Sequence, residues 1–272
     1  MTLNRCHIAF FSLLLLMLPL VNGLGQGISF DAGLTPAQNR LIVRTQYRAF
    51  STAEGTNTTR TKMVPVVVAY GVRPGFTLMM RNMYMRQTMG SNDAMNNLMD
   101  PLLLAKFRLY RKNTANWVLG VAPHLATNVP LGFSDMNPRS WNPEVGMNIS
   151  FRPRFLSFDL STVYQADDLF AQNEFSGGGE FRVNSAFSSV VPLSPGGEIA
   201  IAPVLEMNYL RRNNEGMDRS LFQQLLFVSP GASLMSSLLT LEMLLQVPVY
   251  QQDPVSYTDQ GARIIAGLKI MF

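Results

Sequence analysis

The sequence is poor in charge and contains few long apolar runs. Asp, Glu, Lys and Arg make up 15% of the 272 residues, whereas hydrophobic residues make up 47%. Disordered chains have the opposite balance, so this composition excludes intrinsic disorder. The basic residues are scattered and form no Lys/Arg run, which argues against a nucleic-acid-binding protein. Beyond the N-terminus, no stretch approaches the roughly 20 apolar residues of a transmembrane helix.

Residues 1–25 have the pattern of a secretory signal peptide. Arg5 precedes an apolar stretch over residues 8–21, and small residues suited to cleavage follow at Gly23 and Gly25. We therefore expect a cleaved signal over residues 1–25 and a single mature domain over residues 26–272.

Cysteine is also nearly absent. The single cysteine, Cys6, lies before the apolar stretch of the signal, whereas a lipoprotein cysteine would follow it. Cys6 should leave with the signal peptide. The mature chain would then contain no disulfide, no thiolate nucleophile and no cysteine metal site.

The mature chain instead has apolar residues at every second position, which places them on one face of a β-strand. This pattern predicts about twelve strands of roughly 9–13 residues, the length that a tilted strand needs to cross a bilayer. The expected strands lie at residues 40–49, 62–70, 76–84, 103–109, 116–129, 143–152, 156–165, 180–187, 198–209, 221–229, 239–247 and 263–272.

The connections between these segments alternate between long and short. Long polar connections are expected near 51–61, 88–99, 130–141, 166–177, 211–219 and 250–260, and short ones near 71–75, 111–115, 153, 192–197 and 232–235. Outer-membrane barrels have this alternation of long external loops and short periplasmic turns. A secreted β-sandwich would also alternate, but it need not show a continuous apolar face or strictly alternating loops. The sequence therefore predicts an all-β fold, a closed antiparallel transmembrane β-barrel of about 12 strands.

The chain ends on an aromatic residue that follows an alternating apolar pattern. Leu268, Ile270 and Phe272 resemble the C-terminal signal that the barrel-assembly machinery of bacteria reads. We therefore expect the protein in the outer membrane of a Gram-negative-type bacterium. The partners expected there are outer-membrane lipids, the assembly machinery and a small-molecule solute, with no nucleic acid.

Several turns and strand ends come in an order typical of one family. They are Tyr70–Gly75, Lys106–Tyr110, Val129–Gly132, Ser229–Gly231, Gln246–Gln251 and Gly261–Phe272. In these features the chain resembles the outer-membrane transporter family labelled for the MetA pathway of phenol degradation. The resemblance covers approximately residues 40–272 and implies passage of small, often hydrophobic or aromatic compounds. It provides no catalytic residues to carry over.

Charged residues fall mostly on the face opposite the apolar one, which would line the lumen. The expected basic wall consists of Arg40, Arg44, Arg48, Arg81, Lys106, Arg108, Arg263 and Lys269. An acidic wall of Asp159, Glu180, Glu198, Glu206 and Glu242 would face it, and Arg182 and His124 complete the predicted pore lining. Opposed charges can orient polar solutes in a narrow pore. Alternatively, they form salt bridges that fill the lumen, because a twelve-stranded barrel is intermediate between filled and open ones.

A methionine cluster raises the question of a copper site. It comprises Met79, Met80, Met83, Met85, Met89, Met95 and Met99. Thioethers suit Cu(I), but methionine is also an adaptable apolar filler. Because the cluster divides between both strand faces, we predict no metal site and no cofactor.

His124, the only histidine after the signal, invites comparison with outer-membrane phospholipases, which pair a strand histidine with a serine two residues later. That position is Ala126 here, and Ser134 or Ser140 would have to fold back from a loop. We therefore predict no enzyme activity and keep lipid hydrolysis as a remote alternative. The favoured function is a channel or transporter for small molecules. The nearer alternative is a closed barrel that binds a ligand or scaffolds a periplasmic partner.

Overall fold

A computed structural model describes residues 27–55, 57–89, 93–131, 141–153, 156–166, 179–194, 198–213, 222–252 and 258–272. The predicted signal peptide over residues 1–25 lies outside this part of the chain. No helix in the described ranges has the length and hydropathy needed to cross a membrane.

Twelve long strands form the body of the molecule. They are β1 (Leu41–Glu54), β2 (Asn57–Arg73), β3 (Phe76–Met89), β4 (Asp93–Phe107), β6 (Trp117–Asn128), β7 (Pro143–Pro153), β8 (Ser157–Ala166), β9 (Gly179–Ser188), β11 (Ala200–Asn213), β12 (Phe222–Met235), β13 (Leu239–Gln252) and β15 (Arg263–Met271). Three short strands, β5 (Tyr110–Asn113), β10 (Val191–Pro192) and β14 (Thr258–Gln260), pair with β6, β11 and β1.

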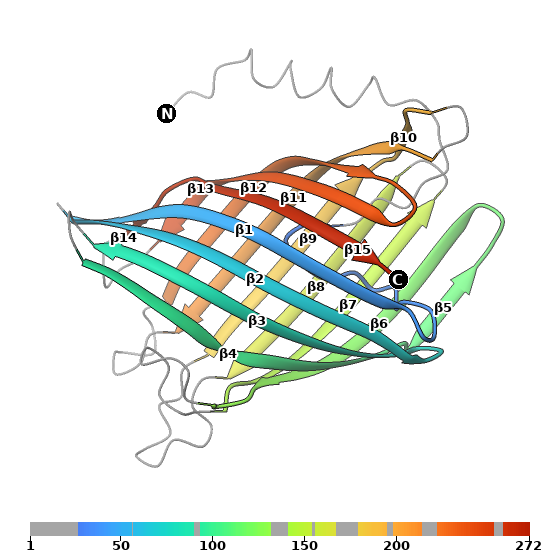
Figure 1. The fold of residues 1–272 in the computed structure, drawn as a ribbon, viewed down its shortest axis with the longest axis horizontal. Helices are drawn as coiled ribbons and strands as arrows, with labels where there is room; N and C mark the ends of the chain where they lie inside the picture. Colours follow the sequence, from blue (N-terminus) through green and yellow to red (C-terminus); the bar gives the residue numbers. More distant parts are fainter. Residues whose placement is uncertain are drawn as a thin grey trace.

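The sheet closes on itself. Each long strand pairs antiparallel with its neighbour along the chain, and β15 pairs with β1 over eight residue pairs from Ile42↔Met271 to Ala49↔Ile264. Figure 1 shows the resulting barrel, with the first and last strands side by side. Closure leaves no long strand with an unpaired edge, as a sheet within lipid requires. The prediction of a closed antiparallel barrel of about twelve strands is confirmed.

The strands extend further than the sequence pattern predicts. Most of the loop expected over residues 51–61 is strand, because β1 and β2 stay paired as far as Glu54↔Asn57. The loop expected over residues 88–99 is likewise mostly strand, and β3 and β4 pair as far as Met89↔Asp93. Polar Thr and Asn residues make these ends look like loops, although Thr suits a strand and the partner strand supplies the backbone hydrogen bonds.

The barrel is apolar outside and polar inside. Large apolar side chains point outward and are exposed, among them Leu103 (47%), Leu125 (59%) and Met243 (65%). Ser150 and Glu206, by contrast, are fully buried within the barrel. This reversal of the usual arrangement is expected where lipid covers the outer face.

Residues 27–37, which precede β1, lie inside the barrel. Ile28 and Ala32 are 0% and 2% exposed, and the residues around them contact side chains from β1, β4, β7 and β11. We call residues 27–37 the luminal segment. No period-two pattern marks this segment in the sequence.

Candidate functional site: the barrel lumen

The buried carboxylate of Glu206 on β11 anchors the start of the luminal segment. It accepts hydrogen bonds from the backbone N–H groups of Ile28 and Ser29, the latter at 3.1 Å, and from the Ser29 hydroxyl. A carboxylate that accepts several N–H bonds is well satisfied even where water is excluded. Glu206 therefore binds the chain itself and is not available to a solute.

Arg44 and Gln46 on β1 hold the same part of the segment from the opposite direction. Both donate to the backbone carbonyl of Ile28, Gln46 through Nε2 at 2.8 Å. The Arg44 guanidinium also pairs with Glu242 on β13 at 2.8 Å. Donors from β1 and an acceptor from β11 thus converge on Ile28 and Ser29, and β13 supports the arginine among these donors.

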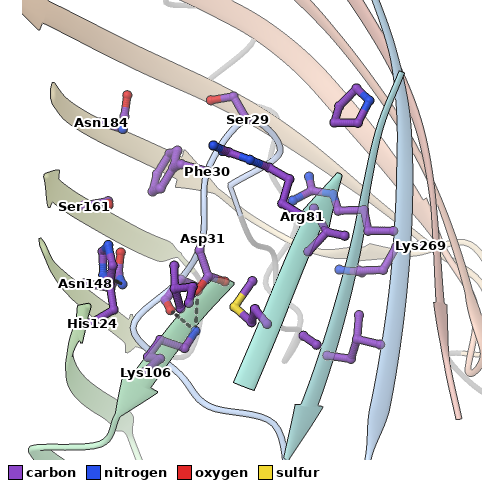
Figure 2. A pocket seen from close by; sticks show the side chains of 18 of the residues that line it. Ser29, Phe30, Asp31, Arg81, Lys106, His124, Asn148, Ser161, Asn184 and Lys269 are labelled. Atoms are coloured by element: carbon purple, nitrogen blue, oxygen red, sulfur yellow. Dashed lines mark hydrogen bonds and ion pairs between the residues drawn. The ribbon is translucent and has the colours of Figure 1, made fainter. Parts of the chain in front are cut away.

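The middle of the luminal segment is held by β4 and β7. Lys106 on β4 is 2% exposed, pairs with Asp31 and donates to the Ala32 carbonyl at 3.0 Å. The Gly33 N–H donates to the Ser150 hydroxyl at 2.8 Å. Figure 2 shows Asp31 and Lys106 joined beneath the turn of the segment.

Gly33 fits only because it has no side chain. A Cβ there would lie 2.7 Å from the backbone nitrogen of Ser150 and 2.8 Å from the carbonyl oxygen of Asn148. These atoms belong to the β7 backbone and cannot move aside without disturbing the ladder. A larger residue at position 33 would therefore push the segment away from the wall.

A second polar network lies on the wall formed by β6, β7 and β9. His124 contacts Glu144 through Nε2 at 3.3 Å and Asn148 through Nδ1 at 2.9 Å. Glu144 also pairs with Arg182. Both ring nitrogens of His124 are thus engaged by Glu144 and Asn148, and among the described residues no serine pairs with it as in a hydrolase.

Two more carboxylates are paired close to their own strands. Asp159 accepts from Arg152 at 3.2 Å and from the Ser150 hydroxyl, and it reaches the Gly27 N–H at 3.3 Å. Glu180 pairs with Arg182 at 3.2 Å and with Arg212. Each of these two carboxylates is therefore paired with an arginine on its own strand or on an adjacent one.

A cavity of about 800 Å³ remains beside the luminal segment. Nine of the residues predicted to line the pore lie on its wall: Arg44, Arg48, Arg81, Lys106, His124, Glu180, Arg182, Arg263 and Lys269. Asp159, Glu206 and Glu242 are buried against the luminal segment and the strands instead.

Three of the predicted lining residues lie elsewhere. Arg40 and Glu198 are exposed and come just before β1 and β11, and Arg108 lies after the end of β4 beside Gly75. They were assigned to the lumen by extending the period of two past the strand ends, where the pleat no longer sets side-chain direction. The picture of two separate charged walls also needs correction, because Arg152 and Arg182 lie among the carboxylates.

Five polar residues of the lumen are absent from the predicted pore lining. Glu144, Asn148 and Arg152 share one face of β7, and the weak alternation over 143–152 could have placed them inward. Asp31 and Ser29 belong to a segment with no period of two. No local signal marks these two residues as lumen partners.

The methionine cluster divides between the two faces, as expected. Met79 lines the cavity and Met85 is buried, whereas Met80, Met89 and Met95 are exposed large hydrophobics. Ser134 and Ser140, the serines considered for His124, lie outside the described residues.

The predicted assembly signal lies at the seam of the barrel. Leu268 and Ile270 pair with Thr45 and Val43 across the junction of β15 and β1. Phe272 is 59% exposed, and its backbone N–H donates to the Leu41 carbonyl at 2.9 Å.

No protein-family model and no curated relative matches the chain by sequence. Among solved structures, the chain is similar to a COG4313 outer membrane channel from Pseudomonas putida F1. The TM-score is 0.60 at 14% identity over 91% of this chain and 100% of that one. It is also similar to the beta domain of the Bordetella autotransporter BrkA, with a TM-score of 0.51 at 7% identity over 86% of this chain and 100% of that one. At identities this low, the structural likeness establishes the fold alone, which is that of a bacterial outer-membrane β-barrel.

Proposed function

We propose that the protein is a non-enzymatic outer-membrane channel or transporter for small molecules. The observation that carries this proposal is the cavity of about 800 Å³ inside a closed barrel, next to a luminal segment held by hydrogen bonds and ion pairs. The likeness to a solved outer membrane channel supports it. The resemblance to the MetA-pathway family favours small hydrophobic or aromatic solutes.

The luminal segment decides how open the lumen is. Its anchors, Glu206, Lys106 and Ser150, are polar side chains of the barrel wall, and the barrel's own ladders do not depend on them. Releasing the segment therefore need not unfold the barrel. Ion pairs fill part of the lumen, and a cavity with charged and apolar lining residues remains beside them.

Single-channel recording in planar bilayers tests the proposal. We expect the purified protein to carry an ion current and Glu206→Ala to carry a larger one, because that variant frees the backbone of Ile28 and Ser29. Gly33→Val should have the same effect through a different contact, its clash with β7. Heat-modifiable gel mobility would confirm that both variants are folded barrels.

Glu198→Ala is the matched control, because Glu198 has the same charge but is exposed just before β11. Its current should equal that of the wild type. If the wild type and both folded variants carry no current, the proposal of a channel is wrong. That result would support the alternative, a closed barrel that binds a ligand or scaffolds a periplasmic partner, which the occupied lumen also permits.

A further inference from the structure

Three arginines that line the cavity have no carboxylate partner in the described part of the chain. Among the described residues, no Asp or Glu lies within ion-pair distance of Arg48, Arg81 or Arg263. All three side chains line the cavity, and Arg81 projects into it (Figure 2). Arg44 and Arg182, by contrast, form ion pairs with Glu242 and Glu144.

Two of these arginines, Arg48 and Arg263, are positioned by contacts that do not neutralise them. Arg48 donates to the Gln46 side-chain oxygen at 2.7 and 3.1 Å. The Arg263 guanidinium lies 4.7 Å from the ring centre of Phe50 and 4.4 Å from that of Phe227. Contacts with uncharged partners fix the direction of a guanidinium and leave its charge in place.

Arg48 is repelled by both of the other arginines. Arg48 lies within electrostatic range of Arg44, Arg81 and Arg263. The carboxylates within electrostatic range of the three arginines are already engaged: Glu206 by the luminal segment, Glu180 by Arg182 and Arg212, and Glu144 by Arg182. An anion placed between the arginines would relieve this repulsion, which is stronger in a confined lumen than in bulk water.

The rest of the cavity wall is suited to an apolar group. Phe30, Val67, Met79, Leu102 and Phe227 line the same cavity as the arginines. A hydrated inorganic anion gains nothing from such a wall. An anion attached to a ring or hydrocarbon chain would bury that part against it.

We propose that Arg48, Arg81 and Arg263 form a binding site for a small organic carboxylate with an apolar ring or chain. The guanidinium groups would hold the carboxylate, since their fork geometry matches its two oxygens. The apolar wall would take the body of the molecule. This inference rests on the proposed function, because it names the class of solute that the lumen receives.

Isothermal titration of sodium benzoate into the detergent-solubilised protein tests the site. We expect saturable binding, and Arg81→Ala should weaken it about tenfold, the loss expected when a charged hydrogen bond is removed. Arg81→Lys should bind with intermediate affinity, because the charge remains but the fork is lost. Since no carboxylate of the described residues pairs with Arg81, its replacement should leave the barrel folded, which heat-modifiable mobility would verify.

Arg86→Ala is the control, because Arg86 is the same residue type on the same strand, β3, but is absent from the cavity wall. It should bind benzoate like the wild type.

Two further ligands test which parts of benzoate the site needs. Benzyl alcohol tests the need for charge, and inorganic phosphate tests the need for the apolar body. Both should bind more weakly than benzoate. Equal affinity for phosphate would overturn the apolar part of the proposal. Unchanged benzoate binding by folded Arg81→Ala would overturn the site.

The binding assay does not depend on conduction. Benzoate binding that requires Arg81, in a protein that carries no current, would support the site and contradict the channel. A current with no benzoate binding would support the channel and contradict the site.

Discussion

At the scale of single residues, buried polar side chains in the lumen hold neighbouring strands together. Glu144 shows this well: it is 7% exposed, pairs with Arg182 and contacts His124. A buried carboxylate is costly unless its oxygens are satisfied. These contacts therefore tie β6, β7 and β9 together from the inside.

Glu144→Ala should destabilise the barrel by about 1–3 kcal/mol, the cost of leaving buried hydrogen-bonding groups unpaired. The loss is limited because Arg182 keeps Glu180 as a partner. Urea unfolding of the protein in detergent micelles or lipid vesicles measures the difference. Glu54→Ala, at the exposed end of β1, should leave the midpoint unchanged. Equal stability of the two variants would show that the inner network does not hold the wall.

The sequence predicts which charges face inward better than it predicts their partners. Period two places Arg44, Arg48 and Arg81 on the lumen side, where the structure has them. It cannot show that Arg44 pairs with Glu242 while Arg81 pairs with no carboxylate of the described ranges. Partners across the lumen come from distant strands, so their pairing depends on closure and register.

At the scale of elements, strands were predictable and the luminal segment was not. A strand in lipid repeats one local rule, apolar outward and polar inward, so each of the twelve left its own pattern. The luminal segment obeys no such rule. Its path is set by Glu206, Lys106 and Ser150, more than 70 residues away along the chain. Only the folded barrel brings those anchors together.

The outward face of β13 provides a test of its environment. Leu245 lies near the middle of the strand, and Tyr250 lies near its end; both are exposed. If lipid surrounds the strand, Leu245→Arg should cost about 2–4 kcal/mol of folding free energy, and Tyr250→Arg only about 0–1. Refolding into phospholipid vesicles, with reversible denaturant titration, would measure both. Equal costs at the two positions would argue that no bilayer lies against this face.

At the scale of the whole molecule, closure between β15 and β1 separates a barrel from an open sheet. The two strands lie at opposite ends of the chain, and their pairing brings Tyr47 opposite Ala266. Directly opposed residues on antiparallel strands have Cα atoms about 4.5–5.5 Å apart, within reach of a disulfide, whereas diagonal neighbours lie about 7–8 Å apart. Register at the seam can therefore be read by cross-linking.

With Cys6→Ser as background, the pair Tyr47→Cys and Ala266→Cys should cross-link on mild oxidation of the folded protein. The pair Tyr47→Cys and Leu268→Cys, one diagonal step away, should not. The bond would make residues 47–266 a covalent ring, so the denatured oxidised chain should migrate differently from the reduced one on a gel. Because a sandwich would keep its first and last strands apart or in another register, cross-linking of the first pair alone requires the closed seam. If both pairs react, the strands slide past one another, and if neither reacts, the barrel does not close between β1 and β15.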